Sequence, residues 1–356
     1  MLLLFAIPGA VAFAPATVTG EAPPVTILHV PQGGEPVGAQ IGPDGSIHLL
    51  YNLGDIPYYV KSSDGGATFT APLPVVNRES RKPGLIFEGL SMAVDKSGVY
   101  VAMSTNNWQV KLPDVAKGFV YATLQAGAKA FTTVRSLNKQ PSEGFSLAAD
   151  GKGRLTATWL ANKLYVNFSA DEGRAFTPNA ELNTDYDPCN CCTTRAVYSH
   201  SGDLAILYRE KSHDDRDMYL VIQDTRGHQT RTRVSSTPWH VNACPMTYYA
   251  LTSTEYGYLA AWPTKGDIYF ARLNSKGTVL PPGEVKTPGH SAMRSGVVAL
   301  SDSDGRTLIA WKRNGELSWQ VYNADGVPQG PAESIQSAGK GAAGVTDLHG
   351  RFILFK

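Results

Sequence analysis

The sequence predicts an all-β fold built from a repeated four-stranded unit, and three observations support this prediction. The chain has 356 residues, of which 42% are hydrophobic and 18% charged, with 35 Gly, 23 Pro and 16 Tyr. Long stretches rich in Ala, Leu, Glu and Lys are missing, which excludes a helical bundle or coiled coil. A unit of roughly 50 residues recurs along the chain, a period typical of propeller blades.

The charge of the chain excludes one class of partner. Lys and Arg number 32 against 31 Asp and Glu, so the formal net charge is +1. A nucleic-acid-binding protein usually carries a basic excess or a basic run, and this sequence has neither. We therefore expect no nucleic-acid partner. The aromatic content and modest charge also indicate a folded chain with a sizeable core.

The N-terminus predicts export. Residues 2–14 form an apolar run that is too short for a membrane span and suits the central region of a secretory signal. An Ala-x-Ala site ending at Ala16 makes residues 1–16 a signal peptide, although no Lys or Arg precedes the apolar run. Pro8 and Pro15 argue against the alternative, a buried strand. We expect a secreted or periplasmic protein, and no later segment is long and apolar enough to span a bilayer.

Each repeat is predicted to contain a strand, a Gly turn, a strand, a longer loop, a strand, a hairpin and a strand. The Gly turns are followed by alternating or apolar segments at 47–51, 99–103, 155–159, 204–208, 258–262 and 308–311. A seventh half-unit, 344–355, ends the chain after two strands, and segment 25–30 can supply its outer strand. Closing the ring in this way removes exposed sheet edges. The prediction is one β-propeller domain, 17–356, with six or seven four-stranded blades and a last blade closed by the N-terminal strand.

Two hairpins share one motif. Segments 62–69 and 169–176 both fit S-x-D-x-G-x-[TA]-F, and each follows a strand-like run. In such a turn the Asp side chain bonds the turn's own amides, Gly takes positive φ, and the aromatic ring packs beneath. The matching residues are Ser62, Asp64, Gly66, Phe69, Ser169, Asp171, Gly173 and Phe176.

This motif resembles the Asp-box, or BNR repeat, of the sialidase-like β-propeller superfamily. The resemblance covers essentially the whole mature chain through the blade period. It implies the sialidase-like propeller fold and places each Asp-box at the periphery, away from the binding face. By that resemblance Asp64 and Asp171 are structural rather than catalytic.

The opposite end of the blades is where a ligand site is expected. The Gly turns and the hairpins share one end, so the loops between second and third strands and the links between blades share the other. Propellers bind ligands where such loops converge around the central channel. Segments 185–195, 211–217, 239–246 and 290–294 lie there, as does Trp108, for which an ordinary loop anchor is preferred over stacking on a sugar.

All four cysteines are predicted to lie on this face. Cys189, Cys191 and Cys192 precede the fourth unit and Cys244 precedes the fifth. One interpretation is two disulfides, with Cys192–Cys244 joining two blades and Cys189–Cys191 forming a strained short loop. The other is a soft-metal site for Cu or Zn made of these thiolates, with possible help from His240, Met246 or Met293.

A wider pattern carries a second resemblance. The segment D-P-C-x-C-C at 187–192 is followed by Arg195, Tyr208-Arg209, Arg216-Asp217 and Trp239 with Cys244-Pro245. This pattern is similar to a subgroup of exported bacterial BNR-repeat proteins, defined by fold rather than by a proven reaction. The chain departs from it at Met246, where a Gly-Pro is expected.

The resemblance also raises the question of sialidase chemistry. That chemistry needs three arginines on a substrate carboxylate, a Tyr nucleophile polarised by Glu, and an Asp acid/base. Segment 36–41 lacks the Arg that family sialidases carry before the first blade, which disfavours a classical sialidase. Arg195 and Arg209 can equally serve to hold loops in place. The candidates are Tyr208, Glu210 and Asp217 for catalysis, and Arg195, Arg209, Arg216, Arg294 and Trp239 for ligand binding.

Three hypotheses follow from the sequence. The first is an exported propeller that binds a polar or acidic small molecule or glycan on the face of blades four and five, with an exo-sialidase-type glycoside hydrolase as its catalytic variant. The second is a soft-metal protein, with Cu ahead of Zn, that uses the cysteines. The third is a scaffold in which disulfides join the blades.

Overall fold

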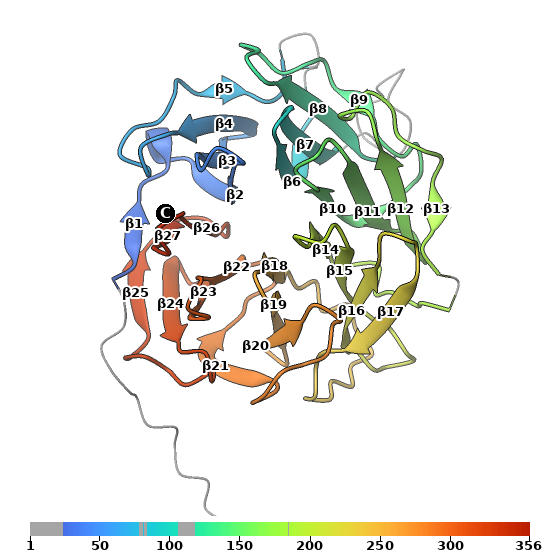
Figure 1. Cartoon of the computed structure of the whole chain (residues 1–356), viewed down its shortest axis with the longest axis vertical. Coiled ribbons are helices and arrows are strands. Elements are labelled where there is room, and N and C mark those ends of the chain that lie inside the picture. The colour runs from blue at the N-terminus through green and yellow to red at the C-terminus, as the bar shows by residue number, and fades with distance from the viewer. Residues whose placement is uncertain (1–23, 78–80, 82–83, 106–117, 184) are drawn as a thin grey trace, which may run out of the picture.

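The structure is a computed structural model that describes residues 24–77, 81, 84–105, 118–183 and 185–356. The predicted signal peptide, residues 1–16, and Trp108 lie outside the described residues. Seven sheets are arranged in a ring, so the chain is a seven-bladed β-propeller (Figure 1). The prediction of an all-β propeller with six or seven blades is thus confirmed, with seven as the number.

The first three blades are four-stranded antiparallel sheets in sequence order. The first blade has β2 (Glu35–Ile41), β3 (Ile47–Leu53), β4 (Ile56–Ser62) and β5 (Leu73–Pro74). The second has β6 (Phe87–Asp95), β7 (Gly98–Thr105), β8 (Val120–Gln125) and β9 (Arg135–Ser136). The third has β10 (Glu143–Ala149), β11 (Leu155–Leu160), β12 (Leu164–Ser169) and β13 (Ala180–Glu181).

The next three blades repeat this order. The fourth has β14 (Thr194–Tyr198), β15 (Leu204–Arg209), β16 (Met218–Gln223) and β17 (Gln229–Arg233). The fifth has β18 (Ala250–Thr254), β19 (Gly257–Thr264), β20 (Asp267–Asn274) and β21 (Val285–His290). The sixth has β22 (Val297–Ser301), β23 (Thr307–Arg313), β24 (Glu316–Tyr322) and β25 (Glu333–Gln336).

The seventh blade joins the two ends of the described chain. It is a three-stranded sheet of β26 (Ala343–Thr346), β27 (Phe352–Phe355) and β1 (Thr26–Leu28). β1 pairs with β27 in parallel, with Thr26 opposite Ile353, and a short 3-10 helix, η1 (Pro31–Gly33), leads into the first blade. Main-chain hydrogen bonds between β1 and β27 therefore close the ring. This pairing covers the edge that β27 would otherwise expose.

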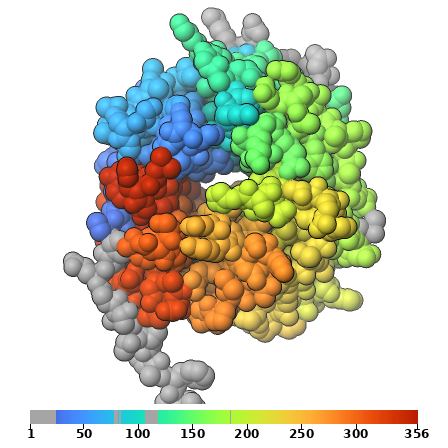
Figure 2. All heavy atoms as spheres, viewed as in Figure 1, coloured from blue at the N-terminus to red at the C-terminus, as the bar shows by residue number. Residues whose placement is uncertain are grey.

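The first strand of each blade faces the centre of the ring. β2, β6, β10, β14, β18, β22 and β26 each contact the corresponding strand of the next blade, and Figure 2 shows a narrow opening between them. The core consists of the interfaces between neighbouring sheets. Between blades one and two, for example, Leu50 and Tyr59 pack with Val101 and Val120, which are all buried. None of the described residues forms a helix that is long and apolar enough to cross a membrane.

The two hairpins that share the motif have the same hydrogen bonds. Ser62 Oγ donates to Asp64 Oδ1 at 2.8 Å and accepts from the Gly66 amide at 2.8 Å. Ser169 Oγ donates to Asp171 Oδ1 at 2.7 Å and accepts from the Gly173 amide at 2.9 Å. Each hairpin places its aromatic ring edge-on against the preceding blade, with Phe69 on Phe355 and Phe176 on Tyr121. The sialidase-like assignment itself stays a prediction.

Candidate functional site

The cysteines lie on two loops that enter neighbouring blades at the same end. Cys189, Cys191 and Cys192 precede β14, and Cys244 lies in the link between β17 and β18. The first loop is held to the end of β15, because the Cys189 amide donates to the Arg209 carbonyl at 2.8 Å. The loop then turns tightly, with the Cys192 amide donating to the Cys189 carbonyl at 3.0 Å. Backbone bonds therefore place the three sulfur atoms together.

One disulfide joins the fourth and fifth blades. It links Cys191 to Cys244, with a Cα–Cα distance of 6.1 Å. The predicted Cys192–Cys244 disulfide was wrong, because Cys244 is bonded to Cys191. The predicted Cys189–Cys191 disulfide was wrong for the same reason. The reason is packing: Cys192 is 3% exposed and turns into the apolar cluster between the blades, whereas Cys191 lies at its edge. Cys189 and Cys192 are free thiols.

Three of the four predicted cysteines form a soft-donor cluster, and the fourth, Cys244, is bonded to Cys191. The Sγ atoms of Cys189, Cys191 and Cys192 all lie within 4.8 Å of one another, and Cys189 Sγ is 3.5 Å from Cys191 Sγ. Thiolates are ligands that Cu(I) and Zn(II) accept. His240 pairs with Asp215, and Met293 is 59% exposed. The donor set that the structure assembles therefore consists of cysteine sulfurs.

A buried arginine lies beside this cluster. Arg209, the last residue of β15, has no exposed surface. Its Nη1 donates to the Arg216 carbonyl at 2.6 Å and its Nη2 to the Pro263 carbonyl at 2.5 Å, while its guanidinium carbon lies 4.8 Å from the centre of the Trp239 ring. Its Nε is buried without a hydrogen-bond partner among the described residues. Arg209 thus connects the end of β15 to the loop at Arg216, to β19 and to Trp239, and it keeps its positive charge inside the protein.

The neighbouring carboxylates are occupied elsewhere. Glu210 pairs with Arg231 at 2.7 Å and Asp217 with Arg233 at 2.9 Å. The Cys192 thiol lies near enough to Arg209 to balance its charge when it is ionised. A hydrogen bond from Cys189 and the positive charge of Arg209 together lower the pKa of Cys192 to about 6, against the opposing effect of burial. The same hydrogen bond and burial raise the pKa of Cys189.

Two of the other predicted ligand-binding arginines are engaged by the protein itself. Arg216 is 5% exposed and donates to the His213 and Asp215 carbonyls at 2.7 and 2.9 Å. Arg195 donates to Thr193 Oγ1 and the Thr194 carbonyl, and Arg294 is exposed. The Nη1 groups of Arg195 and Arg216 therefore already donate to the protein's own main chain. The ligand-binding role of Arg195, Arg209, Arg216, Arg294 and Trp239 stays a prediction.

The predicted catalytic residues lie together where β15 ends and β16 begins in the fourth blade. Tyr208 is fully buried, and its hydroxyl accepts from Arg231 Nε at 2.8 Å. Burial and the nearby Glu210 carboxylate raise the pKa of Tyr208. Arg231 also stacks on Tyr219, with its guanidinium carbon 3.8 Å from the ring centre. This network stabilises the blade, and the catalytic role of Tyr208, Glu210 and Asp217 stays a prediction.

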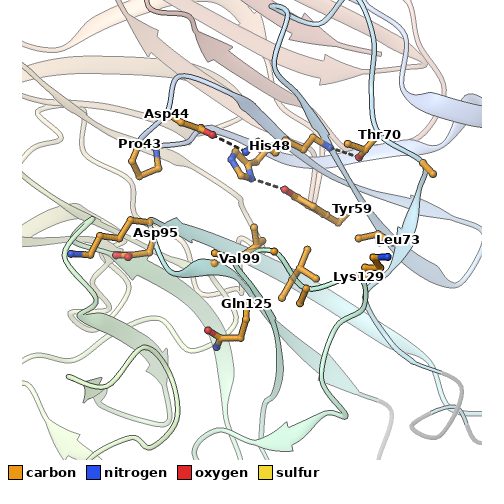
Figure 3. Close-up of a pocket in the computed structure, with 18 residues that line it drawn as sticks. Pro43, Asp44, His48, Tyr59, Thr70, Leu73, Asp95, Val99, Gln125 and Lys129 are labelled. Atoms are coloured by element: carbon orange, nitrogen blue, oxygen red, sulfur yellow. Dashed lines mark hydrogen bonds and ion pairs between the residues drawn. The ribbon is translucent and has the colours of Figure 1, made fainter.

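A feature that sequence reasoning missed lies at the opposite end of the ring. A cavity of about 710 Å³ opens between blades one and two, where His48 and Tyr59 form one wall (Figure 3). The lining residues belong to no motif, although the motif hairpin 62–69 is part of the first blade, and sequence reasoning gave His48 no functional role. The available signal was the hairpin 124–131, which has the length of the two motif hairpins but not their Ser and Asp.

Comparisons with known proteins give distant structural matches and no family. No family model matches the chain, and no curated protein matches it. The chain is similar to the SapL1 lectin solved in complex with alpha methyl fucoside, at 8% identity over 72% of this chain and 84% of that chain, with a TM-score of 0.47. The chain is a seven-bladed β-propeller with lectin and propeller structures among its neighbours.

Two further structures are similar at the same level. A prolyl endopeptidase shares 12% identity over 90% of this chain and 46% of that chain, with a TM-score of 0.49. The Dos1 propeller shares 9% identity over 77% of this chain and 65% of that chain, with a TM-score of 0.43. At such identities the likeness concerns the fold alone.

Proposed function

We propose that this propeller binds a soft metal cation, Cu(I) ahead of Zn(II), through the cysteine cluster between blades four and five. The observation that carries the proposal is the convergence of three cysteine sulfurs within 4.8 Å, of which Cys189 and Cys192 are free thiols. Soft thiolates select Cu(I) and Zn(II) over hard cations. The Cys191–Cys244 disulfide holds the loop that presents them.

Charge balance favours Cu(I). Two thiolates with Cu(I) carry a net charge of −1, and the buried guanidinium of Arg209 offsets that charge in place. Zn(II) in structural sites takes four protein ligands. While Cys191 and Cys244 remain bonded to each other, only Cys189 and Cys192 are available as thiolates. Cu(I), which accepts low coordination numbers, is the better match to this donor set.

The disulfide also supports the proposal that the protein is exported. Disulfides persist in secreted and periplasmic proteins and are rare in reducing compartments. A bond between two blades, across 53 residues of sequence, is the kind that stabilises an exported domain. Export, metal binding and the apolar N-terminal run are thus parts of one proposal.

The test is anaerobic titration of the full chain with Cu(I) in competition with bathocuproine disulfonate. We expect one Cu(I) per chain and two titratable thiols after unfolding without reductant. Cys189→Ser and Cys192→Ser should each abolish tight binding. The matched control is the double variant Cys191→Ser/Cys244→Ser, which removes the disulfide and leaves both proposed ligands.

Two results would overturn the proposal. One is full Cu(I) binding by the Cys189→Ser/Cys192→Ser variant, which would place the metal elsewhere. The other is a count of no titratable thiols in protein purified without reductant, which would show a second disulfide in place of the dithiol.

A further inference from the structure

The cavity between blades one and two lies at the opposite end of the ring from the cysteines. Its volume of about 710 Å³ falls within the range of small-molecule sites. Figure 3 shows His48 and Tyr59 of blade one on one side and Val99 and Gln125 of blade two on the other, with Leu73 and Lys129 near one end. Every residue that lines the cavity is within the described part of the chain.

In the first, third, fifth and sixth blades, a hairpin glycine approaches the preceding blade closely. In the third blade the tip glycine, Gly173, lies so close to the second blade that a Cβ there would be 3.0 Å from Tyr100. In the first blade a Cβ at Gly66 would be 2.2 Å from Leu28 of the seventh blade. Gly277 and Gly326 approach the preceding blade in the same way, at 3.0 and 3.1 Å.

The hairpin of the second blade has the same length and a different tip. Thr132 bonds back to Thr123 through its amide and its hydroxyl, as Thr70 does to Lys61. The eight residues 124–131 therefore correspond one to one to the eight motif residues 62–69. Leu124 stands where the motif has Ser62, and the tip then reads Ala126, Gly127, Ala128 where the motif has Asp64, Gly65, Gly66.

These replacements explain why the space stays open. Leu124 and Ala126 cannot form the Ser–Asp hydrogen bonds that shape the motif turn. Ala128 replaces the glycine that makes the close approach, and a methyl group at that approach would clash. The turn instead puts Gly127 at its tip with φ of 78°, where a Cβ would meet nothing within 4 Å. Phe131 still packs edge-on against Tyr59, so the floor of the cleft is kept while its upper part is vacant.

The wall formed by blade one is rigid. Ser46 Oγ donates to Asp44, so it can only accept from His48 Nε2, at 2.9 Å. His48 Nδ1 then accepts from the Tyr59 hydroxyl at 2.7 Å. His48 is 6% exposed, and a Cβ at Gly42 would lie 2.5 Å from its ring. This chain of hydrogen bonds fixes both rings and shapes the cavity before any ligand arrives.

The lining combines apolar surface with unbalanced positive charge. Leu73, Val99 and Leu124 supply aliphatic surface. Both carboxylates of the lining are engaged: Asp44 pairs with Lys61 at 2.7 Å, and Asp95 accepts from the Gly153 amide at 3.0 Å. Lys96 and Lys129 are exposed and have no hydrogen-bonded or ion-paired partner among the described residues.

We infer that this cavity is a binding site for a small amphipathic anion, a carboxylate or sulfonate with an aliphatic or aromatic body. The body would lie on Leu73, Val99 and Leu124, and the acidic group would face Lys129 at the edge of the cavity (Figure 3). The site is separate from the cysteine cluster and does not depend on a metal.

The experiment uses the full chain and anilinonaphthalene sulfonate as a fluorescent anionic probe, displaced by decanoate. We expect one saturable site. Lys129→Glu should weaken both ligands by about five- to tenfold, since it reverses one exposed charge at the rim. Lys276→Glu, at the hairpin of the fifth blade, is the matched control and should change nothing. Ala128→Trp fills the cavity from its exposed rim and should abolish binding, and Ala71→Trp does so from the other wall.

Decyltrimethylammonium, a cation, and decanol, a neutral compound, have the same ten-carbon chain as decanoate. Comparing the three compounds as competitors separates the effect of the ligand's charge from that of its apolar chain. Displacement of the probe by either compound as effectively as by decanoate would refute the anion preference. Unchanged probe binding in both tryptophan variants, with wild-type unfolding curves, would show that the cavity is not the site.

Discussion

Replacing His48 by Asn should remove a specific part of the acid sensitivity of the fold. Burial lowers the pKa of His48 from 6.5 to about 4, against the opposing effect of the Asp44 carboxylate. Because the folded-state pKa is depressed, the stabilisation is fully present above pH 6.5 and is lost as pH falls to about 4. The difference of about 2.5 pH units corresponds to about 3 kcal/mol. Asn keeps a polar atom near the position of Nδ1, where Tyr59 needs a partner.

Urea unfolding from pH 7.5 to 4 measures this contribution. The free energy of unfolding of the wild type should fall by about 3 kcal/mol more than that of His48→Asn across this interval. Carboxylates such as Asp44 titrate in both proteins, so the difference between the two curves isolates the histidine. Parallel curves would refute the reasoning, because they would mean that His48 is protonated with equal ease in the folded and unfolded chain.

Three further outcomes test the packing. Cys191→Ser/Cys244→Ser should lower the free energy of unfolding by about 4 kcal/mol, since the bond closes a loop of 53 residues, and urea unfolding with and without reductant measures it. Arg209→Met should lower the free energy of unfolding by about 3 kcal/mol or more, since it leaves buried carbonyls without donors. Arg209→Lys should not restore stability, because lysine lacks the planar fork that reaches both Arg216 and Pro263. Full stability of Arg209→Lys in urea would contradict this. Ser62→Ala and Ser169→Ala should each cost about 1–2 kcal/mol, and unequal losses in thermal unfolding would show that the two hairpins are not equivalent.

The fold could be predicted because its signals are local. A turn glycine followed by an alternating or apolar strand marks each blade in the sequence. Asp-containing hairpins also occur at the same position in two blades. The closing strand could be placed for the same reason. The chain begins with one strand that has no blade of its own and ends with two, and pairing these three strands completes the last blade. The period fixes topology without any knowledge of side-chain packing.

The candidate site could be located but not resolved. Spacing placed the cysteines on one face, yet pairing depends on which side chain of the tight turn points into the apolar cluster, and Cys192 rather than Cys191 does so. Arginines were a second difficulty. The sequence around Arg209 does not distinguish a structural arginine from a ligand-binding one. The distinction comes from its hydrogen bonds to the carbonyls of Arg216 and Pro263, which lie on other segments of the chain.

The buried guanidinium and the low-pKa thiol explain each other. A cation with no exposed surface is unfavourable unless an anion lies near, and the carboxylates of the fourth blade pair with Arg231 and Arg233 instead. The thiolate form of Cys192 balances this charge, and the positive charge of Arg209 lowers the pKa of Cys192. Purely structural packing has no need of a thiolate, because an apolar residue would fill the same space. The positive charge of Arg209 therefore favours the thiolate form of Cys192, and the proposed metal binding requires that form.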